Sequence, residues 1–273
     1  MPGSARAQPN PEFGTELVRE WAPSGEPDAH VVLVHGLAEH SGRYERVGTQ
    51  MAEAGLFVRG FDLMGAGASG GRRWYVEDWD RYHDQVGSHV RWARAQGKPV
   101  ILFGHSLGGA LALGYALSDR SQPDLLVLSA PALAGGAGWQ RALAPILARL
   151  APRAAIPNPV RGEHLSRDPA VAAAYFADPL VHSKSTLRFG ALAFAAIDDL
   201  NSRLGELDIP TLVIHGGDDR LVPTASSAPL GGLGCVERRV YEGLRHETMN
   251  EPEGSEVVAD VIAWIRGRIG AGV

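Results

Sequence analysis

Short apolar runs alternate with helical stretches along most of this chain, and this alternation limits its fold more than any other feature. Five of the runs are mainly apolar and the last is more polar: 31–34, 56–61, 100–103, 125–128, 212–214 and 236–241. Apolar runs of this length are typical of parallel strands buried on both faces. Helical patterns lie between or after them, at 79–95, 107–117 and 255–269. We therefore expect an α/β fold, with a mostly parallel central sheet and helices on both faces.

The alternation is interrupted between about residues 132 and 204. Within this stretch, 139–150 has the pattern of an amphipathic helix and 187–197 is strongly apolar. A run this long without a clear strand does not fit the short connections of a compact sheet. We expect it to fold over the carboxyl edge of the sheet as an inserted helical cap. The expected division is a core made of 1–132 and 205–273, with the cap at 133–204.

Composition limits which partners and which cellular location we expect for this protein. The formal net charge is −5 and no block of Lys or Arg is present, so nucleic acid is not an expected partner. Cys235 is the single cysteine, which leaves no intramolecular disulfide and no cysteine-based metal site. Residues 1–12 are polar, carry three prolines and lack the apolar stretch of a signal peptide, so we expect a disordered tail and a cytoplasmic location. No apolar run approaches the ~20 residues that span a bilayer.

The sequence Gly-His-Ser-Leu-Gly at 104–108 follows the apolar run 100–103 and opens a helical pattern. A sharp strand-to-helix turn of this kind holds a serine in a strained conformation with its hydroxyl exposed. The two glycines have no β-carbon to clash in such a turn, and the helix N-terminus directs its free N–H groups at the site. We predict that Ser106 is a nucleophile; the alternative is a tight turn with an incidental serine.

A serine hydroxyl needs a base to become an effective nucleophile. His246 follows the last predicted strand, which is where the base lies in folds with the chain order Ser, Asp, His. The acid should then lie between Ser106 and His246 at the end of a strand, and both Asp218 and Asp219 follow the run 212–214. We favour Asp219 as the acid that accepts the Nδ1–H of His246, with Asp218 as a turn residue.

Acyl transfer also requires hydrogen-bond donors for the oxygen that gains negative charge. One donor is the backbone N–H after the nucleophile, on Leu107, and the other comes from the loop after an early strand. The run 31–34 leads into His35-Gly36-Leu37. We therefore predict that the N–H groups of Leu37 and Leu107 form the oxyanion hole, and that His35 orients the loop.

Several of these segments resemble the monoacylglycerol lipases. The most specific is 35–44 (HGLAEHSGRY), and 104–109, 216–219 and 241–246 agree with the family in order and spacing. The segments 165–168 (LSRD) and 178–181 (DPLV) are similar to the cap region of that family. The resemblance covers nearly everything from about Glu16 to the C-terminus. It implies an α/β-hydrolase that cleaves a monoacylglycerol to glycerol and a fatty acid, without a metal or an organic cofactor.

The resemblance also implies roles outside the triad. Glu39, Arg43 and Tyr175 match polar family positions, and they would either lie near the glycerol end of the substrate or form a network that holds the oxyanion loop. The cap would border an acyl tunnel, lined by residues of which some would instead be the core of the cap: Leu143, Ile146, Leu147, Leu192, Phe194 and Ile197. The expected partner is a small amphipathic lipid ester. Contact of the cap with a lipid interface and the oligomeric state are left open.

Other functions fit parts of the same sequence. A broad carboxylesterase or a lysophospholipase would use the same triad on other esters. A peptidase of this fold would need an acidic site for the amino terminus of a peptide, for which Glu39 is the candidate. A non-catalytic binding protein would carry the fold without a working nucleophile. A dehalogenase is disfavoured because the elbow residue is Ser106 and not an aspartate.

Overall fold

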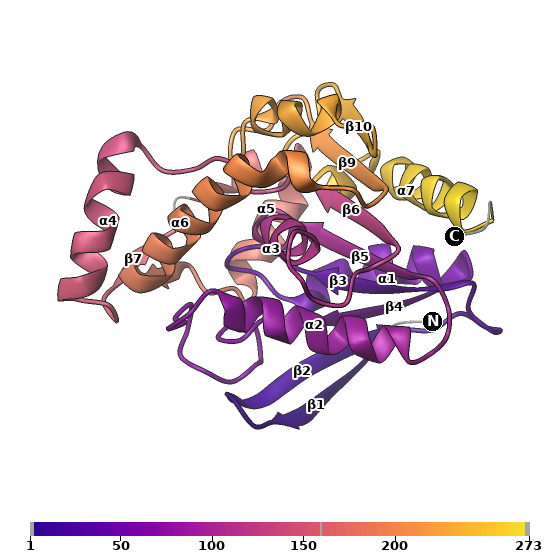
Figure 1. The fold of residues 1–273 in the computed structure, drawn as a ribbon, viewed down its shortest axis with the longest axis horizontal. Helices are drawn as coiled ribbons and strands as arrows, with labels where there is room; N and C mark the ends of the chain where they lie inside the picture. Colours follow the sequence, from indigo (N-terminus) through magenta and orange to yellow (C-terminus); the bar gives the residue numbers. More distant parts are fainter. Residues whose placement is uncertain (1–2, 159, 271–273) are drawn as a thin grey trace.

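The computed structural model describes residues 3–158 and 160–270, which build a central sheet of eight strands (Figure 1). The strand order across the sheet is β1-β2-β4-β3-β5-β6-β9-β10. The six predicted runs are strands β3 (Ala29–Val34), β4 (Leu56–Phe61), β5 (Val100–His105), β6 (Leu125–Ser129), β9 (Thr211–Gly216) and β10 (Val236–Tyr241). Neighbouring strands among these six are parallel, and β2 joins antiparallel to β4. The expected α/β fold with a mostly parallel sheet is confirmed.

Helices cover both faces of the sheet, because successive residues of each buried strand point to opposite faces and each face has its own apolar core. Helices α2 (Asp80–Arg94) and α3 (Leu107–Ala116) pack on one face. Helices α1 (Glu45–Glu53) and α7 (Gly254–Ile269) pack on the other. Helices α2, α3 and α7 agree with the predicted ranges to within a residue or two, whereas the polar α1 was not expected. No described helix is long and apolar enough to cross a membrane.

The N-terminal segment corrects our expectation of a disordered tail at 1–12. Residues Ser4–Asn10 form strand β1, which pairs antiparallel with β2 (Gly14–Trp21) along its whole length. The sequence gives no sign of this strand, because it has no apolar pattern. It lies at the edge of the sheet and most of its side chains are exposed. Met1 and Pro2 of the predicted tail lie outside the described residues.

Strands β6 and β9 are neighbours in the sheet, although a long segment separates them along the chain. The described residues of 133–204 add no strand to the eight-stranded sheet. They form helices and a small antiparallel strand pair: α4 (Gly138–Leu150), β7 (Ala155–Pro157), η2 (Gly162–His164), α5 (Pro169–Ala177), β8 (Lys184–Thr186) and α6 (Leu187–Arg203). We retain the division into core and cap as our interpretation of this arrangement.

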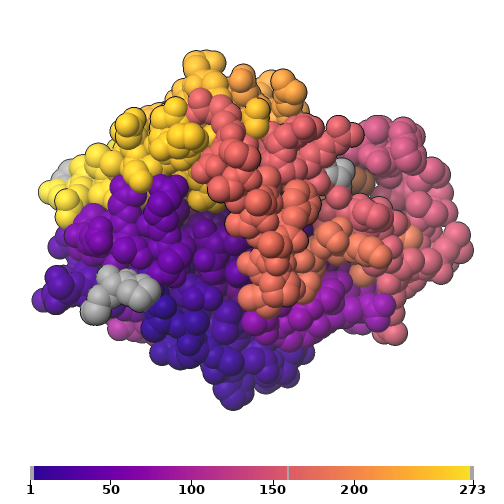
Figure 2. Space-filling model, turned by 180° about the vertical axis from the view of Figure 1, so that it is seen from behind, coloured from indigo at the N-terminus to yellow at the C-terminus, as the bar shows by residue number. Residues whose placement is uncertain are grey.

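The cap has an outer and an inner part. Helix α4 lies at the edge of the molecule opposite to α7 (Figure 1). The stretch around α5 forms a band on the surface between the C-terminal part of the chain, in yellow, and the early part, in indigo and purple (Figure 2). The inner part of the cap therefore spans segments that are far apart in the sequence.

Candidate active site

Ser106 lies in the turn between β5 and α3, with a backbone φ of 52° and ψ of −115°. A non-glycine residue in this region is strained, which is a property of the nucleophile elbow. The flanking glycines permit the close approach of chain segments there. A β-carbon on Gly104 would lie 2.2 Å from the carbonyl oxygen of Gly108, and one on Gly108 would lie 2.1 Å from that of Val34. The structure thus contains the strained strand-to-helix turn that the motif predicts.

Asp219 and His246 meet at the carboxyl edge of the sheet. The Oδ2 of Asp219 accepts a hydrogen bond from His246 Nδ1 at 2.7 Å. Its Oδ1 accepts from the N–H groups of Leu221 and Val222, at 2.8 and 2.9 Å. Burial alone would raise the pKa of Asp219, but hydrogen bonds from His215 and His246 outweigh it and hold the pKa well below its usual range. Asp219 therefore stays a charged acceptor, as the orienting acid requires.

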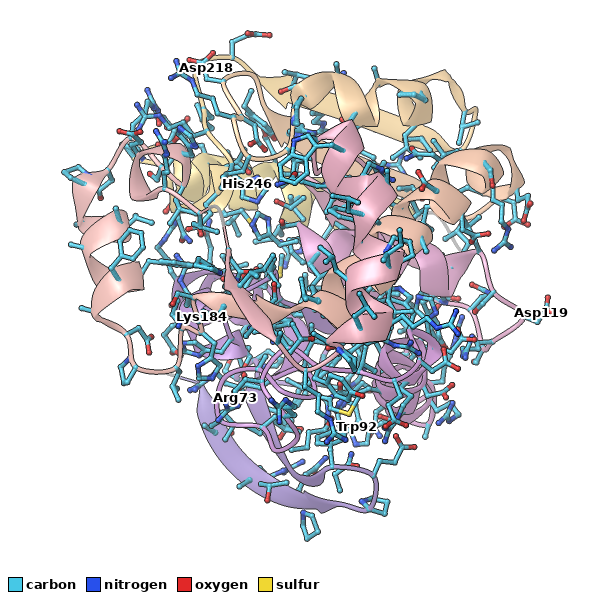
Figure 3. All side chains as sticks on the ribbon, turned by 90° about the vertical axis from the view of Figure 1, so that its left-hand side faces the viewer. Arg73, Trp92, Asp119, Lys184, Asp218 and His246 are labelled. Atoms are coloured by element: carbon cyan, nitrogen blue, oxygen red, sulfur yellow. The ribbon has the colours of Figure 1, made fainter. Side chains whose placement is uncertain are left out.

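Asp218 is the carboxylate that competes with Asp219 in the sequence. It is exposed and lies at the outer surface, away from His246 (Figure 3). A second histidine, His215, was not predicted: its Nε2 lies 3.2 Å from Asp219 Oδ2, and its Nδ1 lies 2.8 Å from Ser227 Oγ. Its position within β9 gave no sign of this role, because the sequence shows only a buried strand there. The geometry favours Asp219 over Asp218.

His246 lies beside the nucleophile elbow. Its ring packs against the ring of His105 with the two centroids 4.9 Å apart, and His105 immediately precedes Ser106. Burial and the neighbouring His246 lower the pKa of His105 to about 4, so this ring is neutral at pH 7. Within the described ranges no hydrogen bond joins Ser106 Oγ to His246, and such contacts often tighten only when substrate binds. The contact between nucleophile and base therefore stays a prediction.

The loop after β3 lies against the nucleophile. A β-carbon on Gly36 would lie 3.3 Å from the Cβ of Ser106. His35 holds this loop, because its Nδ1 donates to the carbonyl of Gly36 at 2.8 Å and its Nε2 accepts a backbone N–H of the next strand's loop at 2.9 Å. Leu107 begins α3, so its N–H has no partner inside the helix. The N–H groups of Leu37 and Leu107 remain our predicted oxyanion donors.

A buried ionic cluster adjoins this loop, and we call it the Glu39–Arg43–Glu247 cluster. Arg43 donates to Glu39 Oε2 at 2.6 Å and to both oxygens of Glu247 at 2.7 and 2.8 Å. The Oε1 of Glu39 accepts from Gly36 N–H at 2.6 Å and from the Tyr44 hydroxyl at 2.7 Å. Burial raises the pKa of Glu39, but the Arg43 charge and further neighbours outweigh burial and lower it to about 2. Both Glu39 oxygens are thus engaged within the protein, which favours the network role over glycerol binding.

Two glutamates of this region were missed by the sequence reasoning. Glu247 is 5% exposed and belongs to the cluster above. Glu251 has a fully buried side chain that accepts hydrogen bonds from the N–H groups of Arg245 and Arg167, at 2.7 and 2.8 Å, and from Ser166 Oγ at 3.0 Å. Their partners are distant in the sequence, so the one available signal was the presence of two acidic residues within the five positions after the predicted base.

Tyr175 completes the polar group predicted from the family resemblance. It is buried on α5, and the Cζ atom of Arg43 lies 4.9 Å from the centroid of its ring. Burial and the nearby Glu39 raise the pKa of Tyr175 above the ordinary range of tyrosine. Its hydroxyl makes no hydrogen bond with any other described residue. The structure therefore brings Glu39, Arg43 and Tyr175 together, and the Tyr175 hydroxyl has no partner among the described residues.

The six apolar cap residues of the prediction separate into two groups. On α6, Leu192 and Phe194 are half-buried and Ile197 is buried. On α4, the side chains are exposed by 41–56%: Leu143, Ile146 and Leu147. The structure does not enclose this second group, so their role as walls of an acyl tunnel stays a prediction. Among residues 3–158 and 160–270, no three His, Cys, Asp or Glu side chains are arranged to hold a metal ion.

A strained serine after the central strand, followed in the chain by an acid and then a histidine after later strands, is the order found in α/β-hydrolases. The fold and the site place the chain in that class. The sequence family described as serine aminopeptidase, S33, matches residues 25–253.

Relatives and a solved structure narrow the class further. A monoacylglycerol lipase of Mycolicibacterium smegmatis is 37% identical over 262 residues, 92% of this chain and 93% of that protein. The phospholipase YtpA of Bacillus subtilis is 30% identical over 240 residues, 85% of this chain and 92% of that protein. The structure of a Paleococcus ferrophilus monoacylglycerol lipase matches with a TM-score of 0.84 and 29% identity, over 92% of this chain and 98% of that one. The chain belongs to the monoacylglycerol lipase family of α/β-hydrolases and is a carboxylic ester hydrolase.

Proposed function

We propose that this enzyme hydrolyses monoacylglycerols to glycerol and a fatty acid, with Ser106 as nucleophile, His246 as base and Asp219 as the orienting acid. The observation that carries the proposal is the 2.7 Å hydrogen bond from His246 Nδ1 to Asp219, beside the strained backbone of Ser106. The bond leaves the Nε2 of His246 free to take a proton. The names of the relatives support a lipid ester as the substrate.

The reaction proceeds in two steps. Ser106 Oγ attacks the ester carbonyl carbon while His246 Nε2 takes its proton, and the N–H groups of Leu37 and Leu107 stabilise the oxyanion. The bond to the glycerol oxygen then breaks, and His246 gives its proton to the leaving glycerol. Water attacks the acyl-enzyme by the same route and releases the fatty acid and Ser106. The charge of Asp219 stabilises the imidazolium that forms in each step.

The two ends of the substrate meet different surroundings. Tyr175 has a hydroxyl without a partner among the described residues, so we assign it to the glycerol hydroxyls, while Glu39 and Arg43 hold the loop. The half-buried side chains of α6, Leu192 and Phe194, together with Ile197, are the proposed contacts of the acyl chain. Each buried CH₂ group contributes about 0.8 kcal/mol, which favours longer chains as far as the site encloses them.

We further propose that helix α4 contacts a lipid interface. Its large apolar residues recur at helical spacing, so they share one face of the helix, and all are exposed: Trp139, Leu143, Ile146, Leu147 and Leu150. We call this set the α4 stripe. On the other side of the helix Ala148 is buried, and Arg141 forms an ion pair with Asp198 of α6. The stripe therefore has no partner among the described residues, and a lipid surface would cover it.

The charge around the α4 stripe favours an anionic surface. Residues 133–204 include eight Lys and Arg against five Asp and Glu, a formal charge of +3 in a chain whose net charge is −5. Several of these cations are exposed near α4 and β7: Arg149, Arg153 and Lys184, with Arg72 donating to the Arg153 carbonyl. Arg73 and Lys184 lie on one side of the face that carries the cap (Figure 3). Basic residues beside a membrane contribute about 1 kcal/mol each toward anionic lipid.

Two rival activities use the same machinery. A lysophospholipase or broad carboxylesterase differs in the leaving group it accepts. The similarity to a phospholipase is the observation that favours this alternative. A peptidase needs a free carboxylate to bind the amino terminus of its substrate, but both oxygens of Glu39 are engaged by the protein's own groups. The ester hydrolases are therefore favoured over the peptidase.

The test is turnover of a series of monoacylglycerols by the wild type and by Ser106→Ala, with diacylglycerol and lysophospholipid as comparators. We expect Ser106→Ala to lower kcat by at least about 10⁴-fold. Asp219→Asn should lower kcat by about 10³- to 10⁴-fold, whereas Asp218→Asn, a matched change at the neighbouring exposed position, should lower it less than about 3-fold. Equal effects of the two Asp substitutions would contradict the proposed acid, and a preference for lysophospholipid would favour the rival activity.

A further inference from the structure

The Glu39–Arg43–Glu247 cluster connects the two loops that would perform the chemistry. Glu247 follows His246 directly, and its carboxylate binds Arg43 through both oxygens. Arg43 binds Glu39 at 2.6 Å, and Glu39 binds the N–H of Gly36 at 2.6 Å. An unbroken series of short, buried, charge-assisted hydrogen bonds thus runs from the residue after the base to the residue before the predicted oxyanion donor. Bonds of this kind are roughly twice as strong as neutral ones.

Glu247 is fixed at both its backbone and its side chain. Its N–H donates to the carbonyl of Leu165 at 2.8 Å, and its Oε2 also accepts from Asn250 Nδ2 at 2.9 Å. The Glu247 carboxylate, and Arg43 bound to it, are therefore held in a fixed position relative to the loop that carries His246, which we call the base loop. A catalytic group displaced by about 1 Å can lose about 10²-fold in rate, so a connection that fixes the distance between the two loops has a direct effect on turnover.

We propose that Glu247 is a positioning residue that sets the separation of His246 from the oxyanion loop and adds negative charge beside the base. The inference rests on the proposed roles of Ser106 and His246. The cluster contains two carboxylates and one guanidinium, so its net charge is negative. Both carboxylates act to raise the pKa of His105, whose ring packs against His246, while Arg43 acts to lower it. A negative charge near a base favours the protonated form of that base.

Other titratable and charged groups surround the rings of His246 and His105. They come from the end of β9, the segment that contains η1 (Ser41–Tyr44), and η2: Asp219 and His215, Glu39, Arg43 and Tyr44, and His164. Substitution of Glu247 changes the charge of none of these groups. A change in the pH profile of such a variant would therefore report the charge of Glu247.

The test compares Glu247→Gln with Glu247→Asp on a soluble ester substrate. Glu247→Gln removes the charge and keeps the shape. We expect kcat to fall about 10- to 30-fold with KM within about 3-fold, since positioning acts on the transition state. The acid limb of kcat/KM reports the base, which must be neutral to accept a proton. A nearby negative charge favours the protonated form of a base, so this limb should move to lower pH in Glu247→Gln. Glu247→Asp keeps the charge and loses the reach, so kcat should fall while the limb stays in place.

Glu242→Gln is the matched control, because Glu242 is an exposed glutamate in the same loop. It should leave kcat and the pH profile unchanged. Labelling of Ser106 with a fluorophosphonate and thermal unfolding show whether each variant retains the fold. The proposal would be overturned if Glu247→Gln kept the wild-type kcat and the wild-type acid limb of kcat/KM. If Glu247→Gln does not fold, a wild-type kcat in Glu247→Asp would overturn the proposal instead. A wild type that labels but cleaves no ester would instead refute the proposed function.

Discussion

The inner and outer parts of the cap differ in what they touch. The inner part, 162–182, is joined at both ends to the loops of the proposed active site. At one end, the N–H groups of His246 and Glu247 donate to the carbonyls of His164 and Leu165, at 3.4 and 2.8 Å. At the other end, the N–H of His182 donates to the carbonyl of Ala38 at 3.1 Å. In Figure 2 this part forms the band that runs beside the C-terminal surface, in yellow, and the early surface, in indigo and purple.

The outer part, α4, has a different chemistry. It packs on α6 through its small side chains and leaves its large apolar residues exposed. Exposed apolar stripes of this kind mark contact surfaces. The inner part, in contrast, is hydrogen-bonded at both ends to the two loops, through the backbone of His164, Leu165 and His182. The difference teaches that the cap is not uniform: its inner part is bonded to the loops of the proposed active site, whereas its outer part carries the exposed stripe that we propose meets a lipid surface.

The strongest test of this contrast removes the carboxylate that joins the inner cap to the base loop. Glu251→Ala leaves the N–H groups of Arg245 and Arg167 without their buried acceptor. We expect the free energy of unfolding in urea to fall by about 3–5 kcal/mol. Glu253→Ala is the matched control, because Glu253 is an exposed partner of the same arginine, Arg167. It should cost less than about 1 kcal/mol. Equal losses would mean that the inner cap is not anchored through Glu251.

A second prediction uses pH to probe the loop after β3, to which the inner part of the cap is bonded through the Ala38 carbonyl. Burial and the partners of Glu39 change its pKa from the ordinary 4.5 to about 2. A carboxyl with a lowered pKa stabilises the fold fully above its unfolded pKa, and this contribution disappears as the pH falls from about 4.5 to about 2. Glu39→Gln should therefore be less stable than the wild type by up to about 3 kcal/mol at pH 7, and the difference should shrink toward pH 2.

Urea unfolding of both proteins from pH 3 to pH 8 measures this difference. Glu53→Gln, at an exposed position of α1, should change the stability by less than about 0.5 kcal/mol throughout. If the difference in free energy of unfolding between Glu39→Gln and the wild type stays constant down to pH 3, the charge of the Glu39 carboxylate is not what stabilises the loop after β3.

The same contrast explains how far the sequence alone could lead. The buried parallel strands were predictable because each carries a continuous apolar run, and the order of Ser106, Asp219 and His246 followed from which strand each residue succeeds. Strand β1 could not be predicted from the sequence, because an exposed edge strand needs no apolar pattern. The pairing of Glu247 with Arg43 was also out of reach, since a buried ion pair between residues 204 positions apart leaves no periodic signal.

The α4 stripe shows a further limit of the pattern. Its apolar spacing correctly predicts an amphipathic helix, but periodicity does not state whether the apolar face points inward or outward. Leu143, Ile146 and Leu147 were therefore assigned to an enclosed tunnel, whereas they are exposed. The exposed fractions decide this, in agreement with the position of α4 at the edge of the molecule (Figure 1).

The smallest expected change in stability, and the sharpest test of the outer part, comes from Ile146→Ser combined with Leu150→Ser. These side chains are 56% and 77% exposed, so the free energy of unfolding should change by less than about 1 kcal/mol. Binding to phosphatidylglycerol vesicles should fall about 10-fold, because both side chains lose apolar area that the interface would bury. Hydrolysis of a water-soluble ester should stay within about 2-fold of the wild type, since both side chains are exposed and α4 packs chiefly on α6.

Ala142→Ser combined with Ala151→Ser is the control, with the same number of serines at exposed positions of α4 and its C-terminal end, outside the stripe. Phosphatidylcholine vesicles separate charge from apolar contact: the exposed cations predict weaker binding of the wild type to them than to phosphatidylglycerol. If the stripe variant binds anionic vesicles as well as the wild type does, the outer part of the cap is not the lipid contact. If it instead loses activity on the soluble ester, α4 belongs to the framework of the site, and the contrast between the two parts of the cap fails.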